Sequence, residues 1–480
     1  MNPSIEYAQI APALIVFGAA IIGVLVEAFA PAASRTVVHG LLSGTAVVAA
    51  FVAVVALAND DAPPRAVILG SVAADGLSLA LQGLLLIAAL PALALMVARG
   101  NPLTHTEGVP LAMFALGGML AFVSAEDWLT LFVALEVFSL PLYLMCALAR
   151  RRDLLPLEAA LKYFLLGAFS SAILLFGVAL RFAATGSTDI AAAPQDEVLG
   201  AAGAALIGVG LLFKVGAVPF HSWVPDVYQG APTPVTAFMA SATKIAAFGV
   251  LVRITMVAFD DVPWRPVAAV VAVATLAVGS IAAVTQSDVK RMLAYSAIAH
   301  TGFLLVGVYA GTVRGMGAVC FYLAVYALST VGAFAVAGAV REVQPDGRTV
   351  EVSELDRWAG LGRRRPALAG AMALFLLAFA GIPLTSGFVG KFAVFAAAAE
   401  RGGVWLVVVG VLASAVAAVF YLRVIVTMYF APDHEYTPEV PAADTLTWFA
   451  IGVGAVSVVM LGVYPQPLLD LFGDLSLLGR

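Results

Sequence analysis

The chain has 480 residues, of which 62% are hydrophobic and only 11% are charged, against the ~25% charged that is typical of soluble domains. Apolar runs of roughly 18–28 residues recur along it, and each is long enough to cross a bilayer. No segment of ~100 residues is left over for a soluble domain. The composition excludes a soluble enzyme, predicts no nucleic-acid partner, and indicates an all-α polytopic protein of the lipid bilayer.

The hydrophobic pattern predicts about 14 transmembrane segments joined by mostly short connections. The longest connection, 342–366, is charged and is expected to lie against the membrane surface. The predicted segments are about 8–30, 36–58, 74–98, 109–125, 128–149, 156–184, 198–220, 234–258, 265–285, 291–310, 315–341, 367–399, 403–430 and 444–464.

Two of these segments are interrupted, the seventh at Pro219 and the twelfth at Pro383, and each has a lysine close to its proline, Lys214 and Lys391. Broken helices are tolerated at membrane depth only where protein or a wet cavity surrounds them. Two interrupted segments five apart predict two five-helix repeats, the second inverted because five is odd. The predicted parts are 1–108 (three N-terminal helices), 109–258 and 265–430 (the repeats), and 431–480 (the C-terminal helix).

Basic residues are divided unevenly between alternate loops. Of the 25 lysines and arginines, fourteen fall in or beside one set of loops and seven in or beside the other. The remaining four are Lys162, Lys214, Lys244 and Lys391, which lie inside segments. Because cytoplasmic loops carry the excess of basic residues, both termini are predicted to lie on the outer side of the membrane.

Four charged residues are expected to lie at depth in the membrane: Glu136, Lys214, Lys244 and Lys391. Each costs roughly 2.5–3.5 kcal/mol to place in hydrocarbon, and the sum is comparable to a protein's net stability. Packing of an ion pair is the alternative explanation, but this cost favours a function. Burial lowers the pKa of a lysine and a nearby carboxylate raises it. We therefore predict that Glu136 and Lys214 pair across facing helices, and that Lys244, ~15 Å into its helix, stores a proton at mid-membrane.

His300 is a further candidate for the proton path, and Lys162 and His221 are secondary candidates. Lys162 lies near a segment end, where it can serve the pathway, extend to the membrane surface or pair with Glu158 one turn earlier. His300 lies mid-segment between the two halves and titrates near neutral pH, although a single histidine on an apolar face also often only bonds to backbone. His221 shapes the broken helix end or joins the pathway. Lys290 is interpreted mainly as a topology signal.

The sequence shows no cofactor motif. It has no GxGxxG opening a βαβ unit, no Walker loop and no cysteine cluster. The five histidines offer no obvious haem pair. We predict no redox cofactor, nucleotide or metal in this chain.

Two motifs carry a family resemblance: PFHSWVPDVYQGAPTPVTAFMASATK at 219–244 and DVKRMLAYSAIAHTGF at 288–303. They resemble the antiporter-like membrane subunits of respiratory complex I, NADH-quinone oxidoreductase, and their Mrp-type cation/proton antiporter relatives. The resemblance covers roughly 109–430, and the outer segments more loosely. It implies fourteen helices, two inverted five-helix bundles and discontinuous seventh and twelfth helices.

The resemblance also implies a proton-translocating subunit of the bacterial plasma membrane with no redox centre of its own. NADH, flavin, iron–sulfur clusters and quinone would belong to partner subunits. These partners would include a further antiporter-like subunit, M, small membrane subunits and, indirectly, the peripheral redox arm. The residues matching the family's site are Glu136 on the fifth helix, Lys214 on the seventh, Lys244 on the eighth, His300 on the central axis and Lys391 on the twelfth, with Pro219 and Pro383 breaking the helices.

Two alternative functions are also consistent with the sequence. A sodium (cation)/proton antiporter subunit of the Mrp type would use the same lysines. A purely structural membrane scaffold would tolerate their neutralisation.

Overall fold

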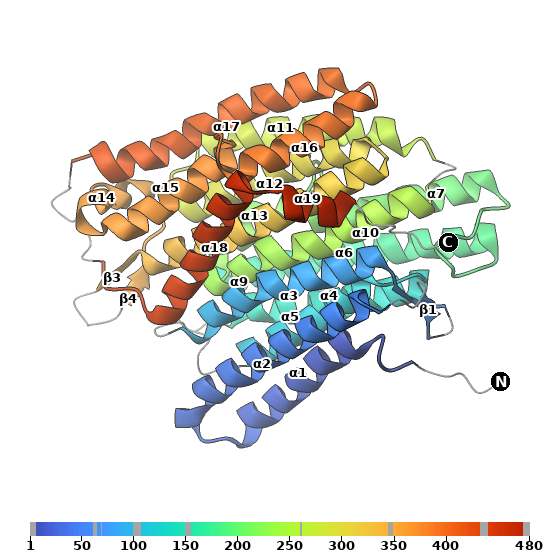
Figure 1. The fold of residues 1–480 in the computed structure, drawn as a ribbon, viewed down its shortest axis with the longest axis horizontal. Helices are drawn as coiled ribbons and strands as arrows, with labels where there is room; N and C mark the ends of the chain where they lie inside the picture. The colour runs from blue at the N-terminus through green and yellow to red at the C-terminus, as the bar shows by residue number, and fades with distance from the viewer. Residues whose placement is uncertain are drawn as a thin grey trace.

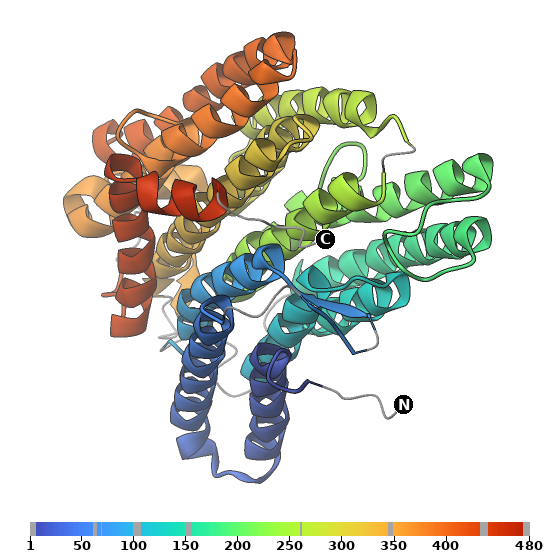
Figure 2. The ribbon, with the colours of Figure 1, turned by 45° about the vertical axis from the view of Figure 1, so that its right-hand side comes forward.

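The computed structural model describes residues 6–60, 65–68, 70–98, 107–148, 155–259, 262–343, 349–432 and 440–473. In these ranges the chain is a bundle of long helices with two short antiparallel hairpins, as Figures 1 and 2 show. The predicted all-α, multi-pass membrane fold is confirmed.

Twelve helices of the described chain are long and apolar enough to cross a membrane. They are α1 (Ala11–Phe29), α2 (Ala32–Ala58), α3 (Gly76–Val97), α5 (Trp128–Ala147), α6 (Leu155–Thr185), α7 (Glu197–Val215), the continuous span Thr233–Val257, α11 (Trp264–Val284), α12 (Val289–Tyr309), α13 (Val313–Ala339), α17 (Val404–Phe430) and α18 (Thr445–Val463).

Shorter helices fill the remaining predicted segments. The apolar helices α4 (Gly108–Val123) and α15 (Pro366–Ala380) fall below the length of a full span, so the count of fourteen stays a prediction. The other short elements are α8 (Trp223–Gly230), α9 (Thr233–Phe238), the π-helical turn Met239–Thr243, α10 (Lys244–Val257), the 3-10 turn Leu355–Trp358, α14 (Leu361–Arg364), α16 (Ser386–Glu400) and α19 (Gln466–Gly473).

The ends of the helices gather on two sides of the bundle. The hairpin β3 (Arg341–Val343) with β4 (Thr349–Glu351) marks one side, which we call the hairpin side and which lies at the left in Figure 1. The helices α9, α12 and α18 begin there. The hairpin β1 (Arg65–Val67) with β2 (Val72–Ala74) marks the opposite side, at the right in Figure 1.

Polar residues begin many of the spans. A side-chain oxygen that accepts a hydrogen bond from an N–H of the first turn satisfies a donor that the helix itself leaves free. In this chain the capping residues are Asp75 (α3), Asp127 (α5), Asp196 (α7), Asp288 (α12), Thr312 (α13) and Asp444 (α18).

The two predicted helix breaks are present, but glycines end the helices before the prolines. The helix α7 ends at Val215 and is followed by Gly216 with φ of +74°. In the same way α15 ends at Ala380, before Gly381 with φ of +82°. Positive φ strains other residues, so glycine is the natural residue at these two ends. The prolines lie in the links that follow, where they prevent the helices from resuming.

The span Thr233–Val257, α12 and α13 form the centre of the bundle and are buried along nearly all of their surface. By contrast α1, α2 and α18 keep broad apolar faces exposed. Helices that are apolar all round belong in the core, and the lysine within the central span, Lys244, is buried there.

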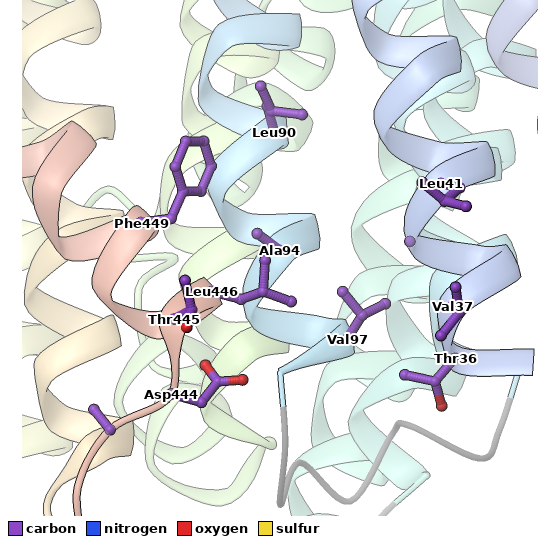
Figure 3. A pocket seen from close by; sticks show the side chains of 12 residues that line it. Thr36, Val37, Leu41, Leu90, Ala94, Val97, Asp444, Thr445, Leu446 and Phe449 are labelled. Atoms are coloured by element: carbon purple, nitrogen blue, oxygen red, sulfur yellow. The ribbon is translucent and has the colours of Figure 1, made fainter. Parts of the chain in front are cut away.

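An open groove of about 830 Å³ lies over α3 between α2 and α18 (Figure 3). Its walls are apolar, with Leu41, Leu90 and Phe449 among them, and Asp444 lies at one end. None of the buried lysines lines this groove, so it is separate from the candidate site.

Two arginines that the sequence pattern places in or beside loops, Arg181 and Arg253, are instead buried within helices. Arg253 of α10 is 4% exposed and binds Asp75 through two hydrogen bonds of 2.8 Å, with a third to Ser78. Arg181 of α6 is 1% exposed and donates to the carbonyl of Ala258 at 2.8 Å. Both charges are tolerated because the fold brings acceptors to them. The counted arginines outside the described residues are Arg99, Arg150, Arg151, Arg152, Arg348 and Arg480.

The Asp75–Arg253 pair ties α3 to the central span. Burial raises the pKa of Asp75, but the charge and hydrogen bonds of Arg253, with those of Ser78, outweigh it and leave that pKa below its usual value. The stabilisation is therefore present at neutral pH and is lost as the pH falls through the lowered pKa.

We expect Asp75→Asn to destabilise the protein by about 3–5 kcal/mol, because it leaves the arginine buried without a counter-charge. The double variant Asp75→Asn/Arg253→Met should recover most of that loss. Thermal unfolding in detergent measures both. A single variant as stable as the parent would contradict the proposed importance of this pair.

Candidate functional site

Lys214 lies in the last turn of α7 and is 5% exposed. Its amine donates to Ser139 Oγ of α5 at 2.7 Å and lies 4.5 Å from the centroid of the Phe138 ring. Glu136, one turn before Ser139, is half-buried and close enough to interact electrostatically with Lys214. The two form no direct salt bridge in the described structure, and Glu136 Oε1 is buried without a hydrogen-bond partner.

The backbone carbonyls on either side of Lys214, at the broken end of α7, are bound by side chains from other helices. The last carbonyls of a helix have no partner within it. Trp223 Nε1 donates to the carbonyl of Phe213 at 3.0 Å, and Thr301 Oγ1 donates to the carbonyl of Val215 at 2.9 Å. The broken end is thus held by α8 on one side and α12 on the other.

Lys244 begins α10, directly after the π-helical turn, and is 3% exposed. Its amine donates to Thr301 Oγ1 at 2.7 Å and to the carbonyl of Ala297. Single π turns within α-helices occur frequently at functional sites. Because the Thr301 hydroxyl also donates to the carbonyl of Val215, it joins the Lys244 amine to the broken end of α7.

His300 of α12 is buried between two tyrosines. Its Nδ1 lies 2.8 Å from the Tyr322 hydroxyl of α13, and its Nε2 lies 3.3 Å from the Tyr421 hydroxyl of α17. The Tyr421 hydroxyl is also 2.5 Å from Ser296 Oγ. The histidine therefore belongs to a network of three hydroxyl groups in the second half of the chain.

Tyr326 lies between Lys244 and His300. Its ring centroid is 5.1 Å from the lysine Nζ and 4.9 Å from the centroid of the imidazole. Beside it is an enclosed cavity of about 10 Å³, also lined by Ser296 and Thr330. That volume is about the size that holds one water.

Lys391 of α16 is 5% exposed and binds the broken end of α15. Its amine donates to the carbonyls of Phe379 at 2.9 Å and Ala380 at 3.0 Å, and to Ser414 Oγ at 2.6 Å. A helix C-terminus carries partial negative charge and attracts cations. Each interrupted helix thus has a buried lysine near its end: Lys214 lies in the last turn of α7, and Lys391 binds the last carbonyls of α15.

The secondary candidates lie apart from this core. Lys162 is 40% exposed along its side chain and pairs with Glu158 and Asp226, each at 2.7 Å. Asp226 also pairs with Arg291 at 2.7 Å. His221 lies in the link after α7 and is half-buried. In the described structure neither Lys162 nor His221 hydrogen-bonds to the buried lysines.

The partners of the lysines were missed in the sequence. Ser139 lies three residues after Glu136, and Thr301 directly follows His300, but hydroxyl residues are too common in apolar segments for such spacing to single them out. Lys290 was interpreted as a topology signal, yet it is only 7% exposed and donates to the carbonyl of Ala231 at 2.9 Å.

No cluster of three or more His, Cys, Asp or Glu side chains suited to a metal ion occurs among the residues that the structure describes. The site is made of amines, hydroxyls, one imidazole and one carboxylate. These groups bind and release protons.

Residues 125–417 match the family described as NADH:quinone oxidoreductase/Mrp antiporter, TM, which is more than half of the chain. The chain belongs to this family.

Within the NADH:quinone oxidoreductase/Mrp antiporter family, similarity extends over the full length. The chain is 50% identical to NADH-quinone oxidoreductase subunit N of Rhodococcus opacus (strain B4), covering 98% of this chain and 95% of that protein. The corresponding subunit N of Mycobacteroides abscessus is 51% identical, covering 99% and 98%.

Solved structures agree in fold. A chain of respiratory complex I from Thermus thermophilus superposes with a TM-score of 0.82 at 34% identity, covering 96% of this chain and 98% of that one. A chain of the Mrp complex from Dietzia sp. reaches 0.83 at 24% identity, covering 97% and 96%, and shows the shared fold alone.

We expect Ser139→Ala to leave the buried amine of Lys214 without its hydroxyl acceptor, at a cost of about 1–3 kcal/mol. Lys214 should then turn to the free oxygen of Glu136 and form a direct salt bridge. Thermal unfolding and the infrared carboxylate bands report the two effects, with Ser139→Thr as the control that keeps the hydroxyl. Unchanged stability and unchanged bands in the alanine variant would exclude this role.

Proposed function

We propose that the chain is a proton-translocating membrane subunit of a bacterial NADH-quinone oxidoreductase, located in the plasma membrane. The similarity to subunit N proteins and to complex I supports this proposal. Protons would move within this chain, while NADH oxidation and quinone reduction take place in partner subunits that hold the flavin and iron–sulfur clusters. The direct neighbours of this chain in the membrane would be the antiporter-like subunit M and the small membrane subunits, and the peripheral redox arm would be an indirect partner.

The observation that carries the proposal is the row of buried proton-binding groups through the core. Thr301 binds the Lys244 amine and the backbone carbonyl of Val215, the residue after Lys214. Tyr326 lies between Lys244 and His300, and Lys391 binds the end of the second broken helix. Three buried lysines cost more than structure alone justifies. A pathway in which these lysines take up and release protons would account for the free-energy cost of burying them.

The carboxylate of Glu136 supplies the means of changing the charge state of Lys214. While Lys214 donates to Ser139, its ammonium is stabilised by a neutral hydroxyl and an aromatic face. A movement toward Glu136 would stabilise the ammonium more strongly, and a movement away would favour loss of its proton. On release an N–H bond of Lys214 breaks and an O–H bond forms on water, or on an acceptor hydroxyl that at the same time gives its own proton to the next acceptor.

We also propose the two inverted repeats, 109–258 and 265–430, flanked by 1–108 and 431–480. The supporting observation is that each repeat contains one helix ending at a glycine of positive φ beside a buried lysine. From the loop charges we propose that the hairpin side is the inner side, which places both termini outside.

A second candidate is an Mrp-type cation/proton antiporter subunit, because the matched family includes Mrp antiporters as well as the oxidoreductase. Co-purification discriminates between the two. Partner subunits carrying flavin and iron–sulfur clusters support the oxidoreductase, whereas sodium-dependent transport without redox partners supports the antiporter.

Lys244→Ala should abolish or strongly reduce NADH-driven proton pumping in membrane vesicles, because it removes the central site. Lys244→Arg should not restore pumping, since arginine keeps its proton in proteins. Pumping is measured as protons moved per NADH oxidised, in membranes whose content of assembled complex has been matched.

The two Lys244 variants separate three explanations. Normal pumping by the alanine variant would indicate a structural scaffold. Normal pumping by the arginine variant alone would mean that a fixed positive charge suffices and that Lys244 does not exchange its proton.

Tyr421→Phe removes the hydroxyl between His300 and Ser296 and keeps the aromatic ring. We expect pumping to fall several-fold, with assembly unchanged, because the hydroxyl network around His300 is interrupted. Tyr429→Phe on the same helix, away from His300, is the matched control. Equal pumping by the two variants would remove Tyr421 from the pathway.

A further inference from the structure

A second buried ionic cluster lies on the hairpin side, outside the row of groups described above. Lys290, the second residue of α12, points its amine toward the carbonyl of Ala231 at 2.9 Å. Its Nζ lies 4.0 Å from Glu351 Oε2 at the end of β4. Glu351 also accepts a hydrogen bond of 2.5 Å from Thr233 Oγ1, at the start of the central span.

The charged groups around this pair come from several elements. Arg341 of β3 lies 3.8 Å from Glu351 Oε1. Asp288 and Cys146 are close enough to interact electrostatically with Lys290, but Asp288 already accepts hydrogen bonds from the Arg291 N–H and the Ser353 hydroxyl. Glu351 is therefore the carboxylate closest to Lys290 among the described residues.

The two partners differ in their access to water. The side chain of Glu351 is 28% exposed, whereas that of Lys290 is 9% exposed. Glu351 belongs to the hairpin that lies at the end of the bundle in Figure 1. A proton arriving from solvent meets the carboxylate first, and the amine lies behind it.

The helix α12 connects this cluster to the centre of the bundle. Ala297 and Thr301, whose oxygens hold the amine of Lys244, follow Lys290 by seven and eleven residues. These spacings are two and three helical turns, so the three residues share one face. Lys290 is thus ~10 Å along α12 from the site of Lys244.

We propose that Glu351 and Lys290 form the proton-uptake site on the hairpin side, feeding the path to Lys244. This rests on the function proposed above. The Glu351 carboxylate takes a proton from bulk water. The O–H bond then breaks as an N–H bond forms on the neutral Lys290 amine, either directly once the 4.0 Å gap closes or through one water. The resulting ammonium releases its proton to water on the α12 face that leads to Lys244.

The test uses Glu351→Gln in the assembled complex, in vesicles with the hairpin side facing the medium. Glutamine still accepts the hydrogen bond from Thr233 but takes up no proton. Pumping at alkaline pH, where protons are scarce, should fall by about tenfold or more, with near-normal pumping at acidic pH. A small weak acid such as formate in the medium should restore pumping at alkaline pH. Glu354→Gln, an exposed carboxylate three residues further on, is the matched control and should leave the pH profile unchanged.

Lys290→Arg is the second variant. The arginine keeps the positive charge beside Glu351 but does not release its proton. This variant should therefore lose pumping at alkaline pH, as Glu351→Gln does, but formate should not restore that pumping. A parental pH profile in either variant would overturn the proposal. So would a Glu351→Gln defect that is equal at every pH, resists formate and accompanies a lower Tm, because that pattern indicates a purely structural contact.

Lys244→Ala, measured alongside, separates this proposal from the general one. If Lys244→Ala pumps normally, the proposed function fails as a whole. If Lys244→Ala is inactive while the Glu351 and Lys290 variants keep the parental pH profile, only the uptake site fails.

Discussion

Burial of lysine ammonium groups in an apolar core is the constraint on which this structure depends. A cation in a low-dielectric interior needs acceptors, and most carbonyls of an unbroken helix are already used by its own hydrogen bonds. The chain meets this need by ending two helices inside the bundle. Lys391 binds the freed carbonyls of α15 directly, and the freed end of α7 holds Thr301, which in turn binds Lys244. The broken helices and the buried lysines are thus parts of one arrangement.

The buried lysines and the buried Arg253 differ in their hydrogen-bond partners. Arg253 is locked by two hydrogen bonds to the carboxylate of Asp75, and arginine does not give up its proton. Lys214, Lys244 and Lys391 instead face hydroxyls, carbonyls and aromatic rings, and none makes a direct salt bridge in the described structure. Neutral partners hold an ammonium less tightly than a carboxylate does. The first kind of site fastens helices together, and the second is suited to exchange of protons.

The helix α12 organises the centre of the bundle. Its carbonyl at Ala297 and hydroxyl at Thr301 hold Lys244, and Thr301 reaches the end of α7. On another face His300 contacts tyrosines of α13 and α17. At its start Lys290 meets the β3–β4 hairpin. A displacement of this one helix would therefore change the surroundings of several proton-binding groups together.

The sequence by itself determined the membrane fold, the two interruptions and the buried lysines. Hydrophobic length, glycine and proline, and the cost of a charge in hydrocarbon are all local properties that can be read along the chain. Tertiary structure decided the partners. Ser139 meets Lys214 from 75 residues away and Thr301 meets Lys244 from 57, while Arg181 and Arg253 lie buried because distant acceptors reach them. A hydroxyl or a cation at a helix end has the same local sequence whether it faces water or the core. Whether such a residue faces water or the core depends only on how helices far apart in the chain pack together.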